Sequence, residues 1–99
     1  MSKEVGIRLD KWLWYARFFK TRSIASGVCS KGKVRVDGTT VHKAHCIIRV
    51  GSVLTFPKAS EICVVRVEGL GNRRGPAREA QLLYTRISES TGRLPISEK

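Results

Sequence analysis

The 99-residue chain is strongly basic, with 19 Lys and Arg against eight Asp and Glu and a formal net charge of +11. This length holds one domain with a small core and leaves no room for a catalytic domain beside a binding module. The charge predicts attraction to polyanions, and residues 1–51 carry most of it, with eleven cations and three acids against eight and five in residues 52–99. The first half is therefore the expected binding half, and a merely solubilising basic surface is the alternative.

The three cysteines indicate a reducing compartment. Cys29, Cys46 and Cys63 stand singly within apolar runs, which favours small buried thiols over a disulfide framework. The amino terminus lacks the apolar core of a signal peptide, and no stretch approaches the ~20 apolar residues of a membrane span. We therefore expect a cytoplasmic protein.

A first helix is expected to end near Lys20, after a flexible start at residues 1–6. Its apolar face consists of residues at helical spacing, which are Leu9, Trp12, Leu13 and Ala16. The opposite side combines cations with aromatic rings, in the set Arg8, Lys11, Tyr15 and Phe18. Rings stack on unpaired bases and cations neutralise phosphates, so this side suits nucleic acid. We predict that Trp12 is buried and that Tyr15 and Phe18 stack on bases, with burial as the alternative for rings so crowded and Trp14 left unassigned.

A second helix is predicted to begin at Thr21, whose hydroxyl suits an N-cap. Its apolar stripe is Ile24, Ala25, Val28 and Cys29. Gly32 suits the left-handed residue that follows a helix, and residues 33–36 alternate cation and valine as in a strand with both cations on one face. Asp37 and Gly38 then favour a two-residue hairpin turn, with residues 39–43 as the returning strand and Val41 inward.

The remaining residues predict a second antiparallel pair and a final helix. Residues 44–49 are expected to cross irregularly to a turn at residues 51–52, followed by strands at 53–56 and 62–67. The glycine-rich residues 69–75 are predicted to form a flexible loop that exposes Arg73 and Arg74 to phosphate. A helix opened by Pro76 should pack residues 80, 83, 84 and 87 on the sheet.

These elements predict an α+β fold in which two N-terminal helices pack on a small, mainly antiparallel twisted sheet, with a C-terminal helix. Residues 7–90 are expected to be a single RNA-binding domain, composed of a helix pair and hairpin at 8–51 and further strands and a helix at 52–90. Residues 1–6 and 91–99 are expected to be flexible.

Two sets of motifs resemble known families. The chain resembles the RNA-binding domain named after the fourth protein of the small ribosomal subunit, in Arg8-Leu9-Asp10-Lys11, Arg17, Thr21-Arg22, residues 31–38, Val41, Lys43 and Val50-Gly51. Residues 9–14, 72–77 and 79–84 are more particular and resemble the family of ribosome-associated heat-shock proteins of fifteen kilodaltons. This resemblance implies that the partner is the free large ribosomal subunit carrying a stalled peptidyl-tRNA, and that the role is rescue or recycling of blocked ribosomes during heat stress. Members of the family generally continue into a longer basic C-terminal extension.

Other chemistries are less well supported by the sequence. His42, His45 and Cys46 lack a paired Cys-x-x-Cys, and strand alternation would separate the two histidines, so neither a metal nor another cofactor is expected. The glycine-rich residues fail the dinucleotide-binding fingerprint because Arg74 takes the place of its last glycine. Scattered acids and the lack of a nucleophile motif argue against enzyme activity.

We therefore expect a non-catalytic, monomeric RNA-binding protein whose partners are ribosomal RNA and the large subunit, with tRNA as a further candidate partner and with no membrane and no small-molecule substrate. The candidate RNA-binding residues are Arg8, Lys11, Tyr15, Arg17, Phe18, Lys20, Thr21, Arg22, Lys31, Lys33, Arg35, Lys43, Arg73 and Arg74. Asp10 is expected to favour the positive end of a helix or to orient a neighbouring arginine. One alternative is a targeting module for an RNA-modifying or aminoacylating enzyme. The other is a helix-turn-helix DNA-binding protein, against which the strand after Gly32 argues.

Overall fold

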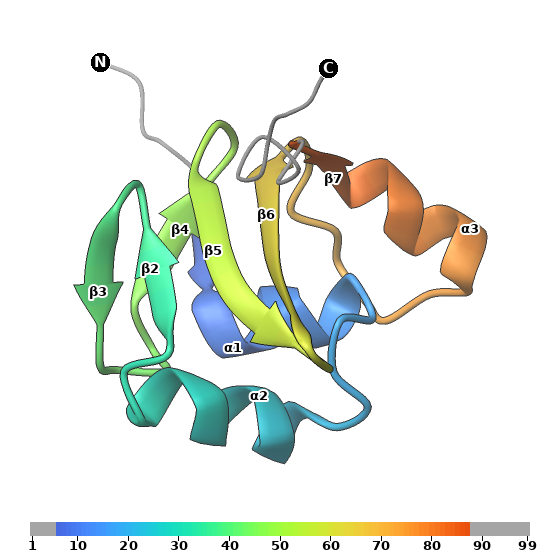
Figure 1. Ribbon diagram of the computed structural model, residues 1–99. Coiled ribbons are helices and arrows are strands. Elements are labelled where there is room, and N and C mark those ends of the chain that lie inside the picture. Colours follow the sequence, from blue (N-terminus) through green and yellow to red (C-terminus); the bar gives the residue numbers. More distant parts are fainter. Residues whose placement is uncertain (1–5, 88–99) are drawn as a thin grey trace.

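A five-stranded antiparallel sheet, in the order β3-β2-β5-β6-β7, runs through the molecule (Figure 1). The computed structural model describes residues 6–87. The strands of this sheet are β2 (Val34–Val36), β3 (Thr39–Val41), β5 (Val53–Lys58), β6 (Glu61–Val67) and β7 (Tyr84–Arg86). Alternation along β5 and β6 turns Leu54, Phe56, Cys63, Val65 and Val67 to the buried side, which leaves the other face of the sheet open to solvent.

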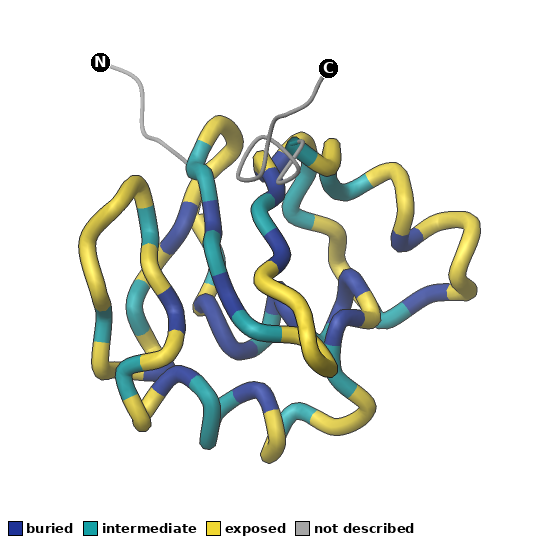
Figure 2. Tube along the Cα trace, in the orientation of Figure 1, coloured by how far each residue is buried: buried dark blue, intermediate teal, exposed yellow. Residues whose placement is uncertain are grey.

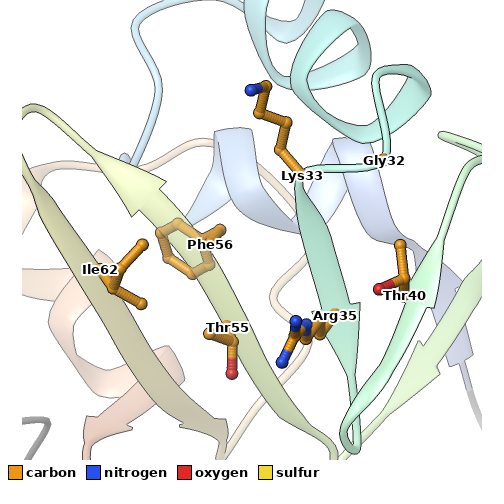
Figure 3. Close-up of a pocket in the computed structure, with 7 residues that line it drawn as sticks. All are labelled: Gly32, Lys33, Arg35, Thr40, Thr55, Phe56 and Ile62. Carbon is orange, nitrogen blue, oxygen red and sulfur yellow. The ribbon is translucent and has the colours of Figure 1, made fainter. Parts of the chain in front are cut away.

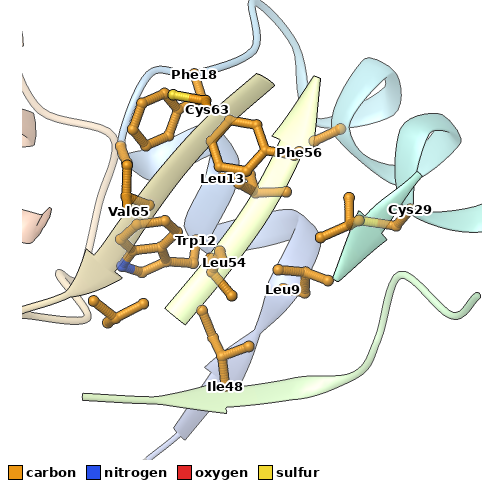
Figure 4. Packing of buried hydrophobic residues seen from close by; sticks show 14 of the residues in the cluster. Leu9, Trp12, Leu13, Phe18, Cys29, Ile48, Leu54, Phe56, Cys63 and Val65 are labelled. Atoms are coloured by element: carbon orange, nitrogen blue, oxygen red, sulfur yellow. The ribbon is translucent and has the colours of Figure 1, made fainter. Parts of the chain in front are cut away.

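Two helices cover the inner face of the sheet. α1 (Leu9–Tyr15) lies behind β5 and β6 in Figure 1, and α2 (Arg22–Ser30) runs below them. The core forms where α1 meets the strands, and Figure 4 shows Leu9, Trp12 and Leu13 facing Leu54 and Phe56. The predicted burial of Trp12 is confirmed, and so are the α+β fold class and the helix pair on a mainly antiparallel sheet.

Local signals in the predicted second helix and hairpin are confirmed. The Thr21 hydroxyl accepts a hydrogen bond from the Ile24 backbone N–H at 3.1 Å. Gly32 has a φ of +74°, a conformation that other side chains rarely adopt, so the backbone at this position favours glycine. Asp37 and Gly38 have φ values of 52° and 86°, as a tight hairpin turn demands. The predicted apolar stripe is wrong at Ile24, which is 47% exposed. Figure 2 shows buried, intermediate and exposed positions along this helix.

The first helix ends at Tyr15 and not near Lys20, because the chain leaves it in a Schellman turn. Arg17 takes a left-handed φ of 66°, the Phe18 N–H donates to the Leu13 carbonyl and the Arg17 N–H donates to the Trp14 carbonyl. This turn folds Phe18 back into the core.

A two-stranded sheet contains Gly6, the last residue of the predicted flexible start, and the end of the predicted irregular crossing, while residues 1–5 lie outside the described residues. β1 (Gly6–Arg8) pairs antiparallel with β4 (Ile47–Arg49), and Ile7 lies opposite the buried Ile48. The pairing continues into α1, because the Leu9 N–H donates to the Cys46 carbonyl at 2.7 Å and the Asp10 N–H to the Ala44 carbonyl at 3.2 Å. The segment before β4 thus satisfies backbone donors that the first helical turn leaves free.

The expected C-terminal helix is much shorter than predicted. α3 (Ala77–Ala80) and a 3₁₀ turn, η1 (Gln81–Leu83), lead directly into β7, which pairs with β6. Residues 84–86 form a strand and not a continued helix because the backbone groups at the edge of β6 need hydrogen-bonding partners. The Tyr84 ring also packs on Phe18, with the ring centroids 4.6 Å apart. The predicted tail at residues 91–99, like residues 1–5, lies outside the described residues.

Candidate nucleic-acid interface

A buried carboxylate holds two predicted site residues together where α1 and α2 begin. Asp10 is only 2% exposed, and Arg8 donates to both of its oxygens, from Nε to Oδ1 at 3.1 Å and from Nη2 to Oδ2 at 3.0 Å. Arg22 Nε lies 3.6 Å from Oδ2. The two arginine side chains are 45% and 41% exposed, so each guanidinium is fixed on one side and open to solvent on the other. The predicted orienting role of Asp10 is confirmed.

The predicted base-stacking rings are not available for stacking. Tyr15 and Phe18 are 8% and 6% exposed, and Phe18 contacts Phe56 at a centroid distance of 4.9 Å. The prediction for these two residues is therefore wrong, because α1 ends early and its turn carries Phe18 inward. Tyr15 instead lies beneath a predicted cation, with Lys11 Nζ 5.7 Å from the ring centroid.

The glycine-rich loop is fastened to the turn between α1 and α2. Arg17 Nε donates to the Gly75 carbonyl at 2.6 Å, and Trp12 Nε1 donates to the Gly69 carbonyl at 2.8 Å. Arg74 donates from Nε to the Trp14 carbonyl at 3.1 Å and from Nη2 to the Phe19 carbonyl at 3.3 Å, with its guanidinium 5.5 Å from the Trp14 ring. Two of the three side chains that hold the loop, Arg17 and Arg74, are thus candidate RNA-binding residues.

Neither arginine of the loop presents a free charge. Arg74 is half-buried and bound to backbone carbonyls, which makes the prediction of an exposed guanidinium wrong for this residue. Arg73 is exposed as predicted, but its Nη2 lies 2.8 Å from both carboxylate oxygens of Glu79. A phosphate at Arg73 would have to compete with this carboxylate.

Among the described residues, most cations without a carboxylate partner belong to the helix pair and the hairpin, and Lys58 and Arg78 lie elsewhere. Within residues 6–87, no carboxylate pairs with the exposed cations Lys20, Lys31, Lys33, Arg35 and Lys43. By contrast, Arg66, Arg73 and Arg86 are each paired with a glutamate, at 3.2, 2.8 and 3.7 Å. The Thr21 hydroxyl accepts the capping hydrogen bond at the start of α2.

The candidate residues form two groups on different sides of the sheet. Arg8 and Arg22 meet around Asp10 at the helices, whereas Arg35 projects from β2 on the outer face. Sequence reasoning missed what surrounds Arg35, a hollow of about 340 Å³ whose walls include Gly32, Lys33, Arg35, Thr40, Thr55 and Ile62 (Figure 3). Strand alternation places each of these side chains on a face, but their meeting depends on the strand register.

The described residues contain no group of three or more His, Cys, Asp or Glu that could hold a metal ion, and His42 and His45 are exposed. The cysteines are free thiols, with Cys29 and Cys63 buried and Cys46 half-buried. In the part of the chain that the structure describes, no helix is long and apolar enough to cross a membrane.

Comparison with known proteins places these features in a family. The S4 domain matches residues 7–54. The chain is 41% identical over 87 residues to the heat shock protein 15 homolog of Haemophilus influenzae, covering 88% of this chain and 66% of that protein. It is also 41% identical over 86 residues to heat shock protein 15 of Escherichia coli, covering 87% and 64%. The chain therefore spans slightly less than two thirds of the length of these relatives.

Two further comparisons extend over most of both partners. The RQC P-site tRNA stabilizing factor of Listeria monocytogenes is 31% identical over 83 residues, which cover 84% of this chain and 88% of that protein. The trimeric structure of Vibrio cholerae heat shock protein 15 superposes with a TM-score of 0.81 at 35% identity, covering 89% of this chain and 88% of that one. Both the sequence and the fold are thus shared along nearly the full described length.

Proposed function

This chain belongs to the heat shock protein 15 family of S4-domain proteins, and on that premise we propose that it is a non-catalytic RNA-binding protein that acts on the ribosome. Its proposed partner is the large ribosomal subunit, through ribosomal RNA and a stalled peptidyl-tRNA. Its proposed role is the rescue or recycling of blocked ribosomes under heat stress, in the cytoplasm. The name of the Listeria relative, a P-site tRNA stabilizing factor, supports a tRNA among the partners.

The observation that carries this proposal is the distribution of unpaired positive charge. The segment that matches the S4 domain holds Lys20, Lys31, Lys33, Arg35 and Lys43 without a carboxylate partner among the described residues. A cation that is not neutralised within the protein gains the full benefit of releasing counterions from a phosphate backbone. Arg66 of β6, Arg73 of the glycine-rich loop and Arg86 of β7 already have glutamate partners, so they gain less.

The geometry supports recognition of RNA by shape and phosphate position. Arg8 and Arg22 are held in fixed orientation by Asp10, and a fixed guanidinium selects the position of a phosphate and not the identity of a base. The rings of Tyr15 and Phe18 are buried, so stacking by these residues plays no part in the proposal. Structured RNA recognised through its backbone contour fits this surface.

Co-sedimentation with separated ribosomal subunits tests the proposal. We expect the protein to sediment with the large subunit, and a Lys11→Ala/Arg22→Ala double variant to bind more weakly, with the salt dependence reduced by about one unit of slope per lost phosphate contact. The matched control is Arg66→Ala/Arg86→Ala, which removes the same charge from residues outside the segment that matches the S4 domain and should retain near wild-type binding.

The same samples separate the competing functions. Stronger binding to duplex DNA than to ribosomal RNA at matched salt would reject the proposal in favour of a DNA-binding protein. Unchanged binding by the Lys11→Ala/Arg22→Ala variant, with unchanged circular dichroism, would show that these residues are misassigned. Light scattering gives the number of copies, for which the sequence predicts one, whereas the Vibrio cholerae relative is trimeric in its solved structure.

A further inference from the structure

The outer face of the sheet carries a row of polar side chains centred on Arg35. In the strand register, Arg35 lies opposite Thr40 on β3 and opposite Thr55 on β5. Side chains directly opposite in antiparallel strands project to the same face, with Cβ atoms ~4.5–5.5 Å apart. Figure 3 shows Arg35 projecting from β2 between the two threonines, whereas Lys33, the residue before β2, points toward α2 and away from Arg35. Arg35 therefore lies between two hydroxyl groups.

The walls of this hollow have the chemistry of an anion site with a polar and an apolar side. Lys33 and Arg35 supply two cations, and among the described residues no carboxylate lines the hollow or pairs with either of them. Ile62 is 54% exposed and forms an apolar wall, while Phe56 closes the floor from the core. The volume of about 340 Å³ lies at the lower end of the ~300–1,000 Å³ of small-ligand sites.

The neighbouring row on the same face is neutral by comparison. Val53, Arg66 and Thr85 lie opposite one another on β5, β6 and β7. Arg66 Nε lies 3.2 Å from Glu68, and hydrogen bonds from the Thr85 hydroxyl and from Arg66 lower the pKa of the Glu68 carboxyl. The carboxylate thus stays ionised and neutralises Arg66, so this row offers no free charge to an anion.

We propose that the hollow binds one nucleotide of the RNA partner, with its phosphate on Arg35 and its ribose 2′-hydroxyl on Thr40 or Thr55. The exposed Ile62 side chain contacts the apolar edge of the sugar or base. This subsite rests on the proposed function and adds to it a contact on the outer sheet face. It also gives the protein a means to distinguish RNA from DNA, because the 2′-hydroxyl is the group that only RNA offers to the threonines.

The test measures fluorescence anisotropy with two probes, oligouridylate and oligodeoxyuridylate of equal length, which differ only in the 2′-hydroxyl. We expect the wild-type protein to prefer the ribose probe. Thr40→Val/Thr55→Val keeps the β-branched shape and should weaken binding of the ribose probe about five-fold per lost hydrogen bond, with no effect on the deoxyribose probe. Arg35→Met should weaken both probes and lower the salt slope by about one unit.

The matched control is Arg66→Met, which removes the same charge from the same sheet face outside the hollow and should leave both affinities unchanged. Equal losses in Arg66→Met and Arg35→Met would overturn the proposal, because the effect would then be one of overall charge. Wild-type affinity in both Thr40→Val/Thr55→Val and Arg35→Met would also overturn the proposal. A change in the oligomeric state of these variants would overturn it too, because the outer sheet face would then be a contact between chains.

The two levels of proposal fail in different ways. If the hollow variants bind like wild type while Lys11→Ala/Arg22→Ala loses binding to the large subunit, the nucleotide subsite is wrong and the proposed function stands. If the wild-type protein binds neither the subunit nor the probes, the proposed function itself is wrong and the subsite falls with it.

Discussion

Replacing Asp10 with asparagine separates the effect of charge from the effect of geometry. The substitution makes the protein one unit more positive, so a purely electrostatic account predicts tighter binding to RNA. In the structure, however, Asp10 is the group that fixes both Arg8 and Arg22. We expect Asp10→Asn to weaken RNA binding although it adds net positive charge.

The magnitudes follow from burial and exposure. Removing one partner of a buried ion pair costs ~3–5 kcal/mol, but both arginines here are more than two fifths exposed and regain water, and asparagine keeps one oxygen acceptor. We therefore expect a loss of about 2 kcal/mol of folding free energy, or roughly 8–16 °C in Tm. Re-ordering two released side chains on binding costs ~0.5–1.5 kcal/mol each, which corresponds to an affinity loss of roughly 5- to 150-fold.

The assay combines thermal unfolding with titration of the large ribosomal subunit, each at a temperature where the variant is folded. Glu79→Gln is the matched control, because it removes one negative charge from the exposed pair with Arg73. We expect the control to lose less than about 1 kcal/mol of stability and to bind RNA as tightly as wild type or slightly better. If folded Asp10→Asn binds as tightly as Glu79→Gln, the orientation of Arg8 and Arg22 does not matter and the reasoning is refuted.

Three further predictions concern the core and the loop. Burial and then the negative charge of Asp10 raise the pKa of the Cys29 thiol from 9.0 to about 12, so the folded state holds a proton that the unfolded state releases. Stability should therefore fall as pH rises from about 9 to about 12, by up to roughly 4 kcal/mol, and urea unfolding of Cys29→Ala should show a weaker fall. Arg74→Ala should cost roughly 1–3 kcal/mol in urea unfolding because it frees the glycine-rich loop, whereas Arg73→Ala should cost less than about 1 kcal/mol; equal costs would contradict the anchoring role. Phe18→Leu should lower stability by less than about 1.5 kcal/mol and leave RNA affinity unchanged, whereas a stacking ring would cost ~1–3 kcal/mol of binding.

Features that depend on a few neighbouring residues were predictable from the sequence. The cap at Thr21, the left-handed Gly32 and the turn at Asp37 and Gly38 each satisfy a local backbone requirement. Arg17 has a left-handed backbone conformation after α1, as Gly32 has after α2, but an arginine does not indicate this conformation in a sequence. The end of α1 and the exposure of Phe18 were therefore predicted wrongly.

Features that depend on distant pairing were not predictable. β1 and β4 are three residues each and are joined only in the fold, so neither has a periodicity to detect. The spacing of Ala80, Leu83 and Tyr84 fits a helix, yet the open edge of β6 takes Tyr84 into a strand. The site shows the same limit. The cations of residues 31–43 were identified because they match the motif of the RNA-binding domain, whereas the position of Thr40 and Thr55 beside Arg35 depends on the register of three strands.

The contribution of a cation to the salt dependence of RNA binding depends on whether a carboxylate in the protein already pairs with it. Arg8 and Arg22 share one buried carboxylate, so together they offer one net charge in a fixed geometry and should influence specificity more than salt dependence. Lys33 and Arg35 have no such partner among the described residues, so each should contribute close to a full counterion to the salt slope. Removing Lys33 and Arg35 should therefore flatten the salt dependence more than removing Arg8 and Arg22, even though both pairs carry the same formal charge.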